Sequence, residues 1–168
     1  MLQKEQYFND LVRRYSERLY WHVRSMVGSH EDADDLMQEI FIKAWKALPS
    51  FRGDSDPFTW LWRIATNETI SHLRKARVRA ALSFSRLDDD ALRISDPSPS
   101  IDGDAAMRAL RKAVMSLPDK QRLVFTMRYW QELSYEQISE ITGTSTGALK
   151  ASYHIAYEKV KAFLDKHD

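Results

Sequence analysis

Cysteine is absent from this 168-residue chain, so neither a disulfide nor a thiolate metal site is possible. Long apolar runs are missing too, because no stretch reaches the roughly eighteen consecutive apolar residues of a membrane-spanning helix. The first residues, Met-Leu-Gln-Lys-Glu-Gln, turn polar at once and lack the apolar core of a secretory signal. We therefore expect a cytoplasmic protein without direct membrane insertion.

A strong net charge is also lacking, since 25 basic and 24 acidic side chains leave a formal charge of +1. The distribution is uneven: residues 1–80 carry +2, residues 81–105 carry −4 and residues 106–168 carry +3. Proteins that bind DNA tightly by themselves neutralise many phosphates. Any DNA binding by this chain is therefore expected to need help from a partner.

Catalytic motifs are not evident in the sequence. It has no phosphate-binding loop and no nucleophile elbow, and His22, His72 and His154 fall on separate predicted elements. We expect no enzymatic activity, no cofactor, no bound metal and no small-molecule substrate.

Helical periodicity dominates what the sequence does contain. Apolar residues recur at helical spacing over residues 3–27, 30–48 and 57–79. Gly28 and Pro49 follow the first two stretches, and Asp56-Pro57 supplies an N-cap and a favoured first residue for the third. No alternating strand pattern competes. The sequence predicts an all-α fold.

Periodicity fails between the third helix and a second helical block. Three aspartates at 88–90 and the run Asp96-Pro-Ser-Pro-Ser100 are typical of a flexible, partly extended linker. We expect two small helical domains, residues 1–80 and 106–168, joined by an acidic flexible linker at residues 81–105. About 24 linker residues at roughly 3.3 Å each can span about 80 Å, so the two domains could contact separated DNA sites.

The second domain begins with a short helix over residues 106–115. Another helix starts at Leu117-Pro118, and its expected buried face consists of Leu123, Val124, Met127 and Trp130. Two further helices follow around a tight turn. Ser134 and Gln137 are spaced for a capping box, Gly143 suits a left-handed helix end, and Ser145 or Thr144 can cap the last helix. This pattern predicts a helix-turn-helix.

The final helix has one apolar stripe, formed by Leu149, Tyr153, Ala156, Val160 and Phe163. Its opposite face carries small or polar side chains that could enter a major groove and reach base edges: Thr146, Lys150, Ala151, His154 and Lys161. The alternative is an ordinary helical hairpin with a solvated outer face. The coincidence of caps, turn glycine and small outer residues favours DNA binding.

The third helix combines aromatic residues at its start with basic residues at its end. Trp60 and Trp62 lie about 200° apart around a helix, so we expect one of them near the surface, where an unpaired base can stack on it. The alternative is that both tryptophans pack between helices. The preceding Phe51-Arg-Gly-Asp54 could rim a pocket for a flipped base, although alone it also fits a polar loop with an anchoring aromatic.

An acidic stripe is predicted on the second helix, where Asp32, Asp35 and Glu39 are three and four residues apart. A metal site is disfavoured because no histidine is spaced as a further ligand. Together with Leu36, Gln38 and Phe41, these carboxylates instead predict a mixed docking surface for a protein partner.

In their order and spacing these segments resemble the extracytoplasmic-function (ECF) sigma factors of bacterial RNA polymerase. The run from Asp32 to Trp45, Phe51-Arg-Gly-Asp54 and the run from Phe58 to Asn67 resemble region 2 of that family. Leu117-Pro118 and the run from Leu133 to Ile138 resemble region 4. The resemblance covers nearly the whole chain and implies a dissociable initiation subunit that directs core polymerase to promoter DNA.

The resemblance also implies roles for individual residues. A polymerase-docking set would contact the clamp helices of the largest polymerase subunit: Asp32, Asp35, Leu36, Gln38, Glu39 and Phe41. A minus-ten set would recognise and help open that promoter element. The resemblance implies Ser50, Phe51, Arg52, Gly53, Asp54 and Asn67, and the aromatic start and basic end of the third helix add Trp60, Arg74 and Lys75. A minus-thirty-five set would read the upstream element. The resemblance implies Lys150, Ala151, Ser152 and His154, and the outer face of the final helix adds Thr146.

The recognition helix departs from the family pattern, because Ser152 and Ile155 stand where arginines are common. We hypothesise that Arg122 and Arg128 carry more of the phosphate contacts at the upstream element. The family also implies an anti-sigma factor that covers the polymerase-docking faces, although no motif identifies it. Two rival classes remain open at this stage: a dimeric repressor or response regulator with a helical sensor, and a purely structural helical adaptor.

Overall fold

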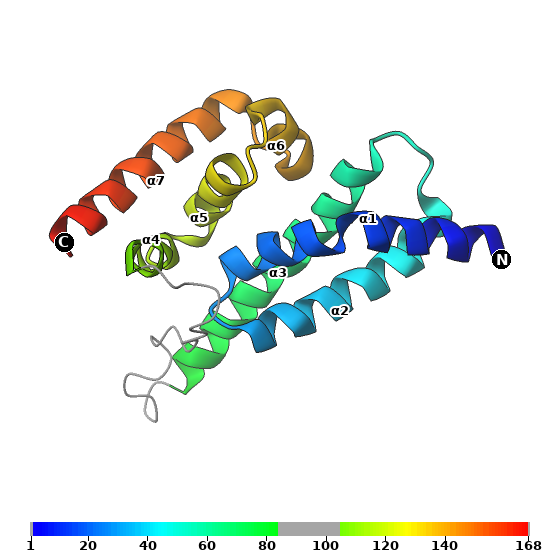
Figure 1. Ribbon diagram of the computed structural model, residues 1–168, viewed down its shortest axis with the longest axis horizontal. Helices are drawn as coiled ribbons and strands as arrows, with labels where there is room; N and C mark the ends of the chain where they lie inside the picture. The colour runs from blue at the N-terminus through cyan, green and yellow to red at the C-terminus, as the bar shows by residue number, and fades with distance from the viewer. Residues whose placement is uncertain (1, 84–104, 168) are drawn as a thin grey trace.

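The computed structural model describes residues 2–83 and 105–167, and within them every regular element is helical (Figure 1). The chain order is α1 (Leu2–Met26), α2 (His30–Ala47), η1 (Leu48–Ser50), α3 (Pro57–Leu82), α4 (Ala105–Met115), α5 (Asp119–Phe125), η3 (Thr126–Trp130), α6 (Tyr135–Thr142) and α7 (Thr146–Lys166). The all-α prediction is confirmed.

Local signals set the boundaries of the first helices. The Ser29 side chain caps α2 by accepting a hydrogen bond from the Asp32 amide, and Asp56 caps α3 by accepting one from Phe58. Pro49 lies in the 3-10 turn η1 that ends α2, and Pro57 is the first residue of α3. The expected helix starts are confirmed, whereas α3 runs to Leu82, a little past its predicted end near residue 79.

The helix predicted to begin at Leu117-Pro118 is interrupted in a way that the sequence did not indicate. It ends as α-helix at Phe125 and continues as the π-helical segment η3, in which the Gln131 amide donates to the Thr126 oxygen. Leu123, Val124 and Met127 are buried as expected, but Trp130 is only half-buried. A π turn contains more residues than an α turn, so the side chains after it point in different directions from those of a continuous α-helix.

The predicted helix-turn-helix is confirmed in its caps and turn. Ser134 and Gln137 form the capping box in both directions, at 3.1 and 2.9 Å. Gly143 has φ 77°, and Ser145 caps α7 through the Ala148 amide. These three features fix the angle at which α7 leaves α6.

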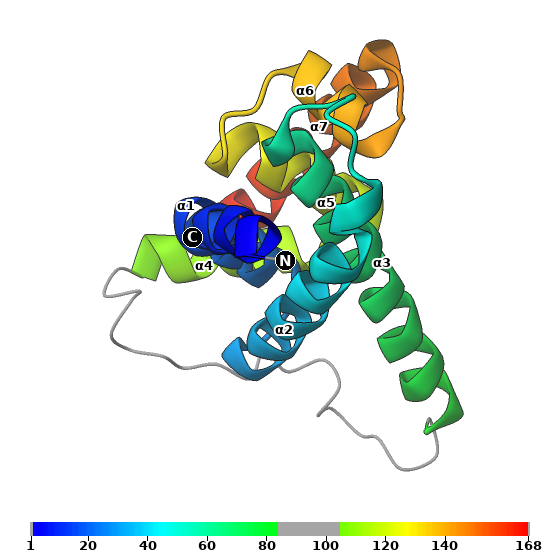
Figure 2. The ribbon, with the colours of Figure 1, turned by 90° about the vertical axis from the view of Figure 1, so that its right-hand side faces the viewer.

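Helices α1, α2 and α3 form an amino-terminal bundle, and α4 to α7 with η3 form a carboxy-terminal module (Figures 1 and 2). The two parts touch: α6 packs beside α3, and α5 and η3 pack beside α1. One apolar cluster runs through both, from Leu11 to Ala65 in the bundle and from Leu123 to Leu149 in the module. A smaller cluster around Phe125 and Val160 belongs to the module alone. The predicted linker falls mainly on residues 84–104, outside the described part.

Candidate nucleic-acid and polymerase interfaces

The predicted docking stripe lies on the outer side of α2. Asp32, Asp35, Gln38 and Glu39 are all exposed, and Phe41 is half-buried with its ring edge-on to Phe8 at 6.2 Å. Leu36 is different, because only 1 % of it is exposed. Its inclusion among the contacting residues was wrong for this conformation: Leu36 packs in the core and supports the stripe from behind.

The minus-ten candidates gather around the turn between α2 and α3. Arg52, Gly53 and Asp54 are exposed, and Phe51 stacks obliquely on Trp60 with ring centroids 4.8 Å apart. Gly53 has φ 76°, a backbone conformation that glycine adopts without strain. An accessible aromatic pair on a turn is a platform on which an unstacked base can lie.

An open pocket borders this turn on the side of α1. It is lined by Gln3, Lys4, Tyr7, Leu48, Pro49, Phe51 and Gly53. Sequence reasoning did not include the α1 residues in the minus-ten set. The available signal was Tyr7, a large aromatic off the apolar stripe of its helix, which is 41 % exposed.

The two tryptophans of α3 differ in burial, as their spacing predicts. Trp62 is fully buried, stacks on Phe58 with centroids 4.0 Å apart and donates its indole hydrogen to the Gln131 Oε1 at 3.0 Å. Trp60 is half-buried beside Phe51. Farther along α3, Asn67, Arg74 and Lys75 are exposed.

The recognition face of α7 is open among the described residues. Lys150, Ala151 and His154 are exposed, while Thr146 and Ser152 are half-buried. The Lys150 amine also lies 5.8 Å from the centroid of the Tyr135 ring. The buried stripe of Leu149, Ala156 and Val160 lies on the opposite side of the helix, as predicted.

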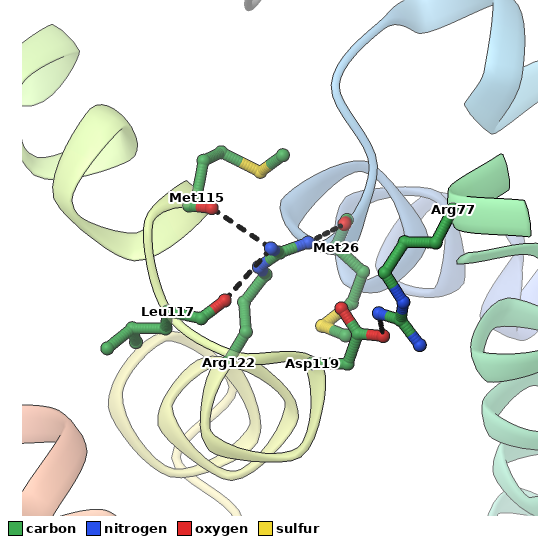
Figure 3. Close-up of polar contacts among 6 residues, drawn as sticks. All are labelled: Met26, Arg77, Met115, Leu117, Asp119 and Arg122. Carbon is green, nitrogen blue, oxygen red and sulfur yellow. Dashed lines mark hydrogen bonds and ion pairs between the residues drawn. The ribbon is translucent and has the colours of Figure 1, made fainter. Parts of the chain in front are cut away.

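The hypothesis that Arg122 contacts DNA phosphates is contradicted by its position. Its guanidinium is buried and donates to the backbone oxygens of Met26 at 2.7 Å, Met115 at 3.0 Å and Leu117 at 3.0 Å (Figure 3). Burial lowers the pKa of Arg122 below its ordinary value, and the positive charge of Arg77 lowers it further. The group is committed to protein contacts in this conformation.

Arg128 is engaged less completely. It donates to the Leu133 oxygen at 3.1 Å and lies 4.9 Å from the centroid of the Tyr135 ring, but it remains half-exposed. Of the two arginines considered for phosphate contacts, only Arg128 is accessible.

His22 is a buried titratable group. It is fully buried beside Trp62, with ring centroids 6.0 Å apart, and neither of its nitrogens has a hydrogen-bond partner among the described residues. Burial first, and then the charge of Arg18, lower the pKa of His22 to about 4. The imidazole is therefore neutral at physiological pH.

Two further features bear on the class of protein. No helix in the described ranges is long and apolar enough to cross a membrane. In the same ranges no three histidine, aspartate or glutamate side chains are grouped so that they could hold a metal ion. The described residues form an all-helical, two-part fold that carries a helix-turn-helix, the architecture of a DNA-binding protein.

Comparison with known families identifies that class more closely. Residues 11–79 match the family described as Sigma-70 region 2, and residues 107–160 match Sigma-70, region 4. The amino-terminal bundle is therefore region 2 and the carboxy-terminal module is region 4. The chain belongs to the ECF sigma factors, which direct RNA polymerase to promoters and are not enzymes.

Individual relatives agree with the family. The chain is 30% identical over 165 residues to the ECF RNA polymerase sigma factor SigW of Bacillus subtilis, covering 92% of this chain and 87% of the relative. It is 34% identical over 165 residues to the ECF RNA polymerase sigma-E factor of Escherichia coli K12, covering 91% and 84%.

Solved structures show the same fold. The sigma factor RpoE, in complex with the anti-sigma factor NepR from Bartonella quintana, matches with a TM-score of 0.79 and 25% identity over 94% of this chain and 96% of that one. CnrH, in complex with the cytosolic domain of CnrY, matches with a TM-score of 0.71 and 23% identity over 98% and 91%. The second likeness concerns the fold alone.

Proposed function

We propose that region 2 docks on the clamp helices of the largest polymerase subunit through the exposed side of α2. Asp32, Asp35, Gln38 and Glu39 supply charge and hydrogen-bonding groups, and the half-buried Phe41 supplies apolar contact. Such a mixed surface orients the encounter by charge while its apolar part adds affinity. Leu36 acts indirectly, by holding α2 in the bundle.

Opening of the minus-ten element is assigned to the turn from Ser50 to Asp54 together with Trp60 and Asn67. A base of the nontemplate strand leaves the duplex and stacks at the Phe51–Trp60 pair, while Arg74 and Lys75 contact phosphates farther along α3. The pocket beside this turn adds Lys4 and Tyr7 to the candidate contacts.

Reading of the minus-thirty-five element is assigned to the exposed face of α7. In this proposal the exposed Lys150, Ala151 and His154 contact base edges, and the half-buried Thr146 and Ser152 contact the flanking DNA backbone. Arg128 remains a candidate phosphate contact, whereas Arg122 does not in this conformation.

One observation favours this function over a repressor or an adaptor. The exposed acidic stripe of α2 lies on the same chain as an open recognition helix, without occupying any DNA-reading residue. A factor that binds DNA alone does not need a second, acidic surface for a partner. A factor that brings polymerase to DNA needs both surfaces at once.

Regulation by an anti-sigma factor is also proposed. The RpoE structure of similar fold contains one, NepR. For this chain we place the partner on the polymerase-docking side, where binding would compete with core polymerase. We place the site of action in the cytoplasm, with polymerase and the chromosome.

The decisive experiment is transcription in vitro with purified core polymerase and fragments of the chromosomal DNA of the source bacterium. We expect start sites that depend on this chain, and expect them to disappear when Asp35 and Glu39 are both changed to lysine. A repressor or an adaptor would give no chain-dependent start site. Replacement of the exposed Glu158 and Asp165 of α7 by lysine is the matched control for total charge.

A further inference from the structure

One aromatic ring of the helix-turn-helix lies beside two cations. Tyr135 is the first residue of α6, and the Arg128 guanidinium of η3 lies over its ring, 4.9 Å from the ring centroid. The Lys150 amine of α7 lies over the same ring at 5.8 Å. Both distances are within the roughly 6 Å over which the face of an aromatic ring attracts a cation. Tyr135 therefore connects cations from two other elements of the module.

The Tyr135 ring is held in position by its surroundings. The capping box of Ser134 and Gln137 fixes the backbone on either side of it. The ring is edge-on to Tyr153, with centroids 6.3 Å apart, and Tyr153 in turn stacks on the buried Phe125. Because these contacts constrain the ring, its position is set before any DNA binds.

Lys150 depends on this contact more than a lysine in a basic helix would. It is the only lysine or arginine in residues 146–155, the part of α7 that faces DNA in the proposed function. Its side chain is exposed, and apart from the Tyr135 ring no described residue holds its amine. Fixing the flexible four-carbon stem of a lysine at a base edge costs conformational entropy. A contact that restricts the stem beforehand lowers that cost.

The strength of the ring contact suits this role. An exposed contact between a cation and an aromatic ring favours the held position about two- to fivefold. This is enough to bias the Lys150 side chain, but weak enough for the amine to leave the ring for a base. Arg128 is held more firmly, since it also donates to the Leu133 oxygen at 3.1 Å. The two like charges beside one ring repel each other, and an approaching DNA anion relieves that repulsion.

We propose that Tyr135 is a positioning residue for reading the upstream promoter element: its ring holds the Lys150 amine where it can donate to the edge of a guanine. The inference rests on the proposed reading of the minus-thirty-five element by α7. Lysine pairs with the O6 and N7 acceptors of guanine in the major groove. Tyr135 thus affects the discrimination between bases through Lys150. If Tyr135 only packed α6 against α7, its loss would weaken binding to every DNA sequence alike.

The test uses polymerase holoenzyme that contains the full-length chain, and a duplex with the upstream element of a promoter found by transcription in vitro. Each guanine of the element is replaced in turn by 7-deazaguanine, which lacks the N7 acceptor. The guanine whose replacement no longer matters in Lys150→Ala is the one that Lys150 reads. Tyr135→Leu removes the ring but keeps an apolar side chain, and it should reduce discrimination at that same guanine about two- to fivefold.

Two further variants separate the ring from its hydroxyl and from general packing. Tyr135→Phe is the matched control, because it keeps the ring, and it should discriminate as the wild type does. A loss in Tyr135→Phe as large as in Tyr135→Leu would assign the effect to the hydroxyl and overturn the proposal. In a Lys150→Ala chain, Tyr135→Leu should cause no further loss of discrimination, since both residues act through one contact. A further loss there would show that Tyr135 acts without Lys150, and would also overturn the proposal.

Fluorination of the ring separates its electrons from its shape. Phenylalanine, a monofluorinated phenylalanine and a trifluorinated one at position 135 are similar in size, but fluorine withdraws the electron density that attracts a cation. We expect discrimination to fall in that order while the thermal stability of the free chain is unchanged. Equal discrimination by the three would overturn the inference and leave the promoter function intact. If the wild-type chain started no transcription the promoter function itself would be wrong, and if Lys150→Ala affected no guanine the assignment of Lys150 would be wrong.

Discussion

The Arg122 guanidinium donates to the backbone oxygen of Met26 across 2.7 Å and 96 positions of sequence. This hydrogen bond joins the end of α1 to the middle of α5, and it is one of several polar contacts between region 2 and region 4. It also removes from the solvent an arginine that sequence reasoning had assigned to DNA phosphates.

Arg122→Ala should lower the free energy of unfolding by about 3 kcal/mol, because it leaves two buried carbonyl oxygens and one half-buried one without their donor. Urea unfolding followed by circular dichroism measures the change. Arg128→Ala is the matched control, since Arg128 is half-exposed and donates to one carbonyl only. Equal losses from the two substitutions would contradict the special position of Arg122.

Acid should destabilise the protein through His22. Its pKa is about 4 when folded and about 6.5 when unfolded, so the unfolded chain binds the additional proton between these values. The contribution to stability is complete above pH 6.5 and is lost as the pH falls toward 4, reaching about 3 kcal/mol in total. Urea unfolding at pH 7.5 and pH 5 measures the part lost between those two values, about 2 kcal/mol.

His22→Leu should reduce that pH dependence, while His154→Gln, at an exposed site, should leave it unchanged. The comparison separates one buried imidazole from the many exposed carboxylates that also titrate in acid. An undiminished loss of stability at pH 5 in His22→Leu would show that other groups cause it.

The sequence revealed features that depend on neighbours along the chain. The capping box of Ser134 and Gln137, the left-handed Gly143 and the Asp56-Pro57 start of α3 are written within a few residues each, and all were predicted. The contrast between Trp60 and Trp62 followed from the helical period. Such signals are local, so a single sequence is enough to read them.

Features that depend on distant contacts were not predictable in this way. Arginine side chains are usually exposed, so the sequence predicts Arg122 at the surface. It is buried because α1 packs against α5 and the Met26 oxygen accepts its hydrogen bond. Leu36 was included in the polymerase-docking set because it lies between exposed acidic residues in the sequence. Only the packing of α2 against its neighbours shows that Leu36 is buried. Tyr7 and Lys4 were missed because α1 and the turn after η1 are far apart in sequence.

Gly143→Ala should destabilise the helix-turn-helix by about 1 kcal/mol, because the residue has φ 77° and a side chain is strained there. Gly147→Ala is the matched control within the same motif. Gly147 lies in α7, and a Cβ added there would meet nothing within 4 Å. Alanine at 147 should therefore be neutral or stabilising by up to about 1 kcal/mol. Thermal unfolding measures the change in stability of both variants. If Gly147→Ala destabilised the protein as Gly143→Ala does, the assigned role of the left-handed turn would be contradicted.

Lys150→Ala should weaken binding of polymerase holoenzyme to the upstream promoter element and lower the slope of log affinity against log salt by about 1. Lys159→Ala is the control, because Lys159 is exposed on the other side of the buried stripe of α7. Fluorescence anisotropy at several salt concentrations measures both variants. The assignment of the recognition face would be wrong if the two substitutions had the same effect.

Phe51→Ala should weaken binding of the holoenzyme to single-stranded nontemplate DNA by about 1 to 3 kcal/mol, since one stacked base loses its platform. Tyr7→Ala should weaken it as well if the pocket between α1 and the turn receives a base. Trp21→Ala is the matched control: this aromatic is 39 % exposed on α1 but does not line the pocket. Competition binding with a short nontemplate oligonucleotide measures all three. An effect of Tyr7→Ala no larger than that of Trp21→Ala would confine base capture to the Phe51–Trp60 pair.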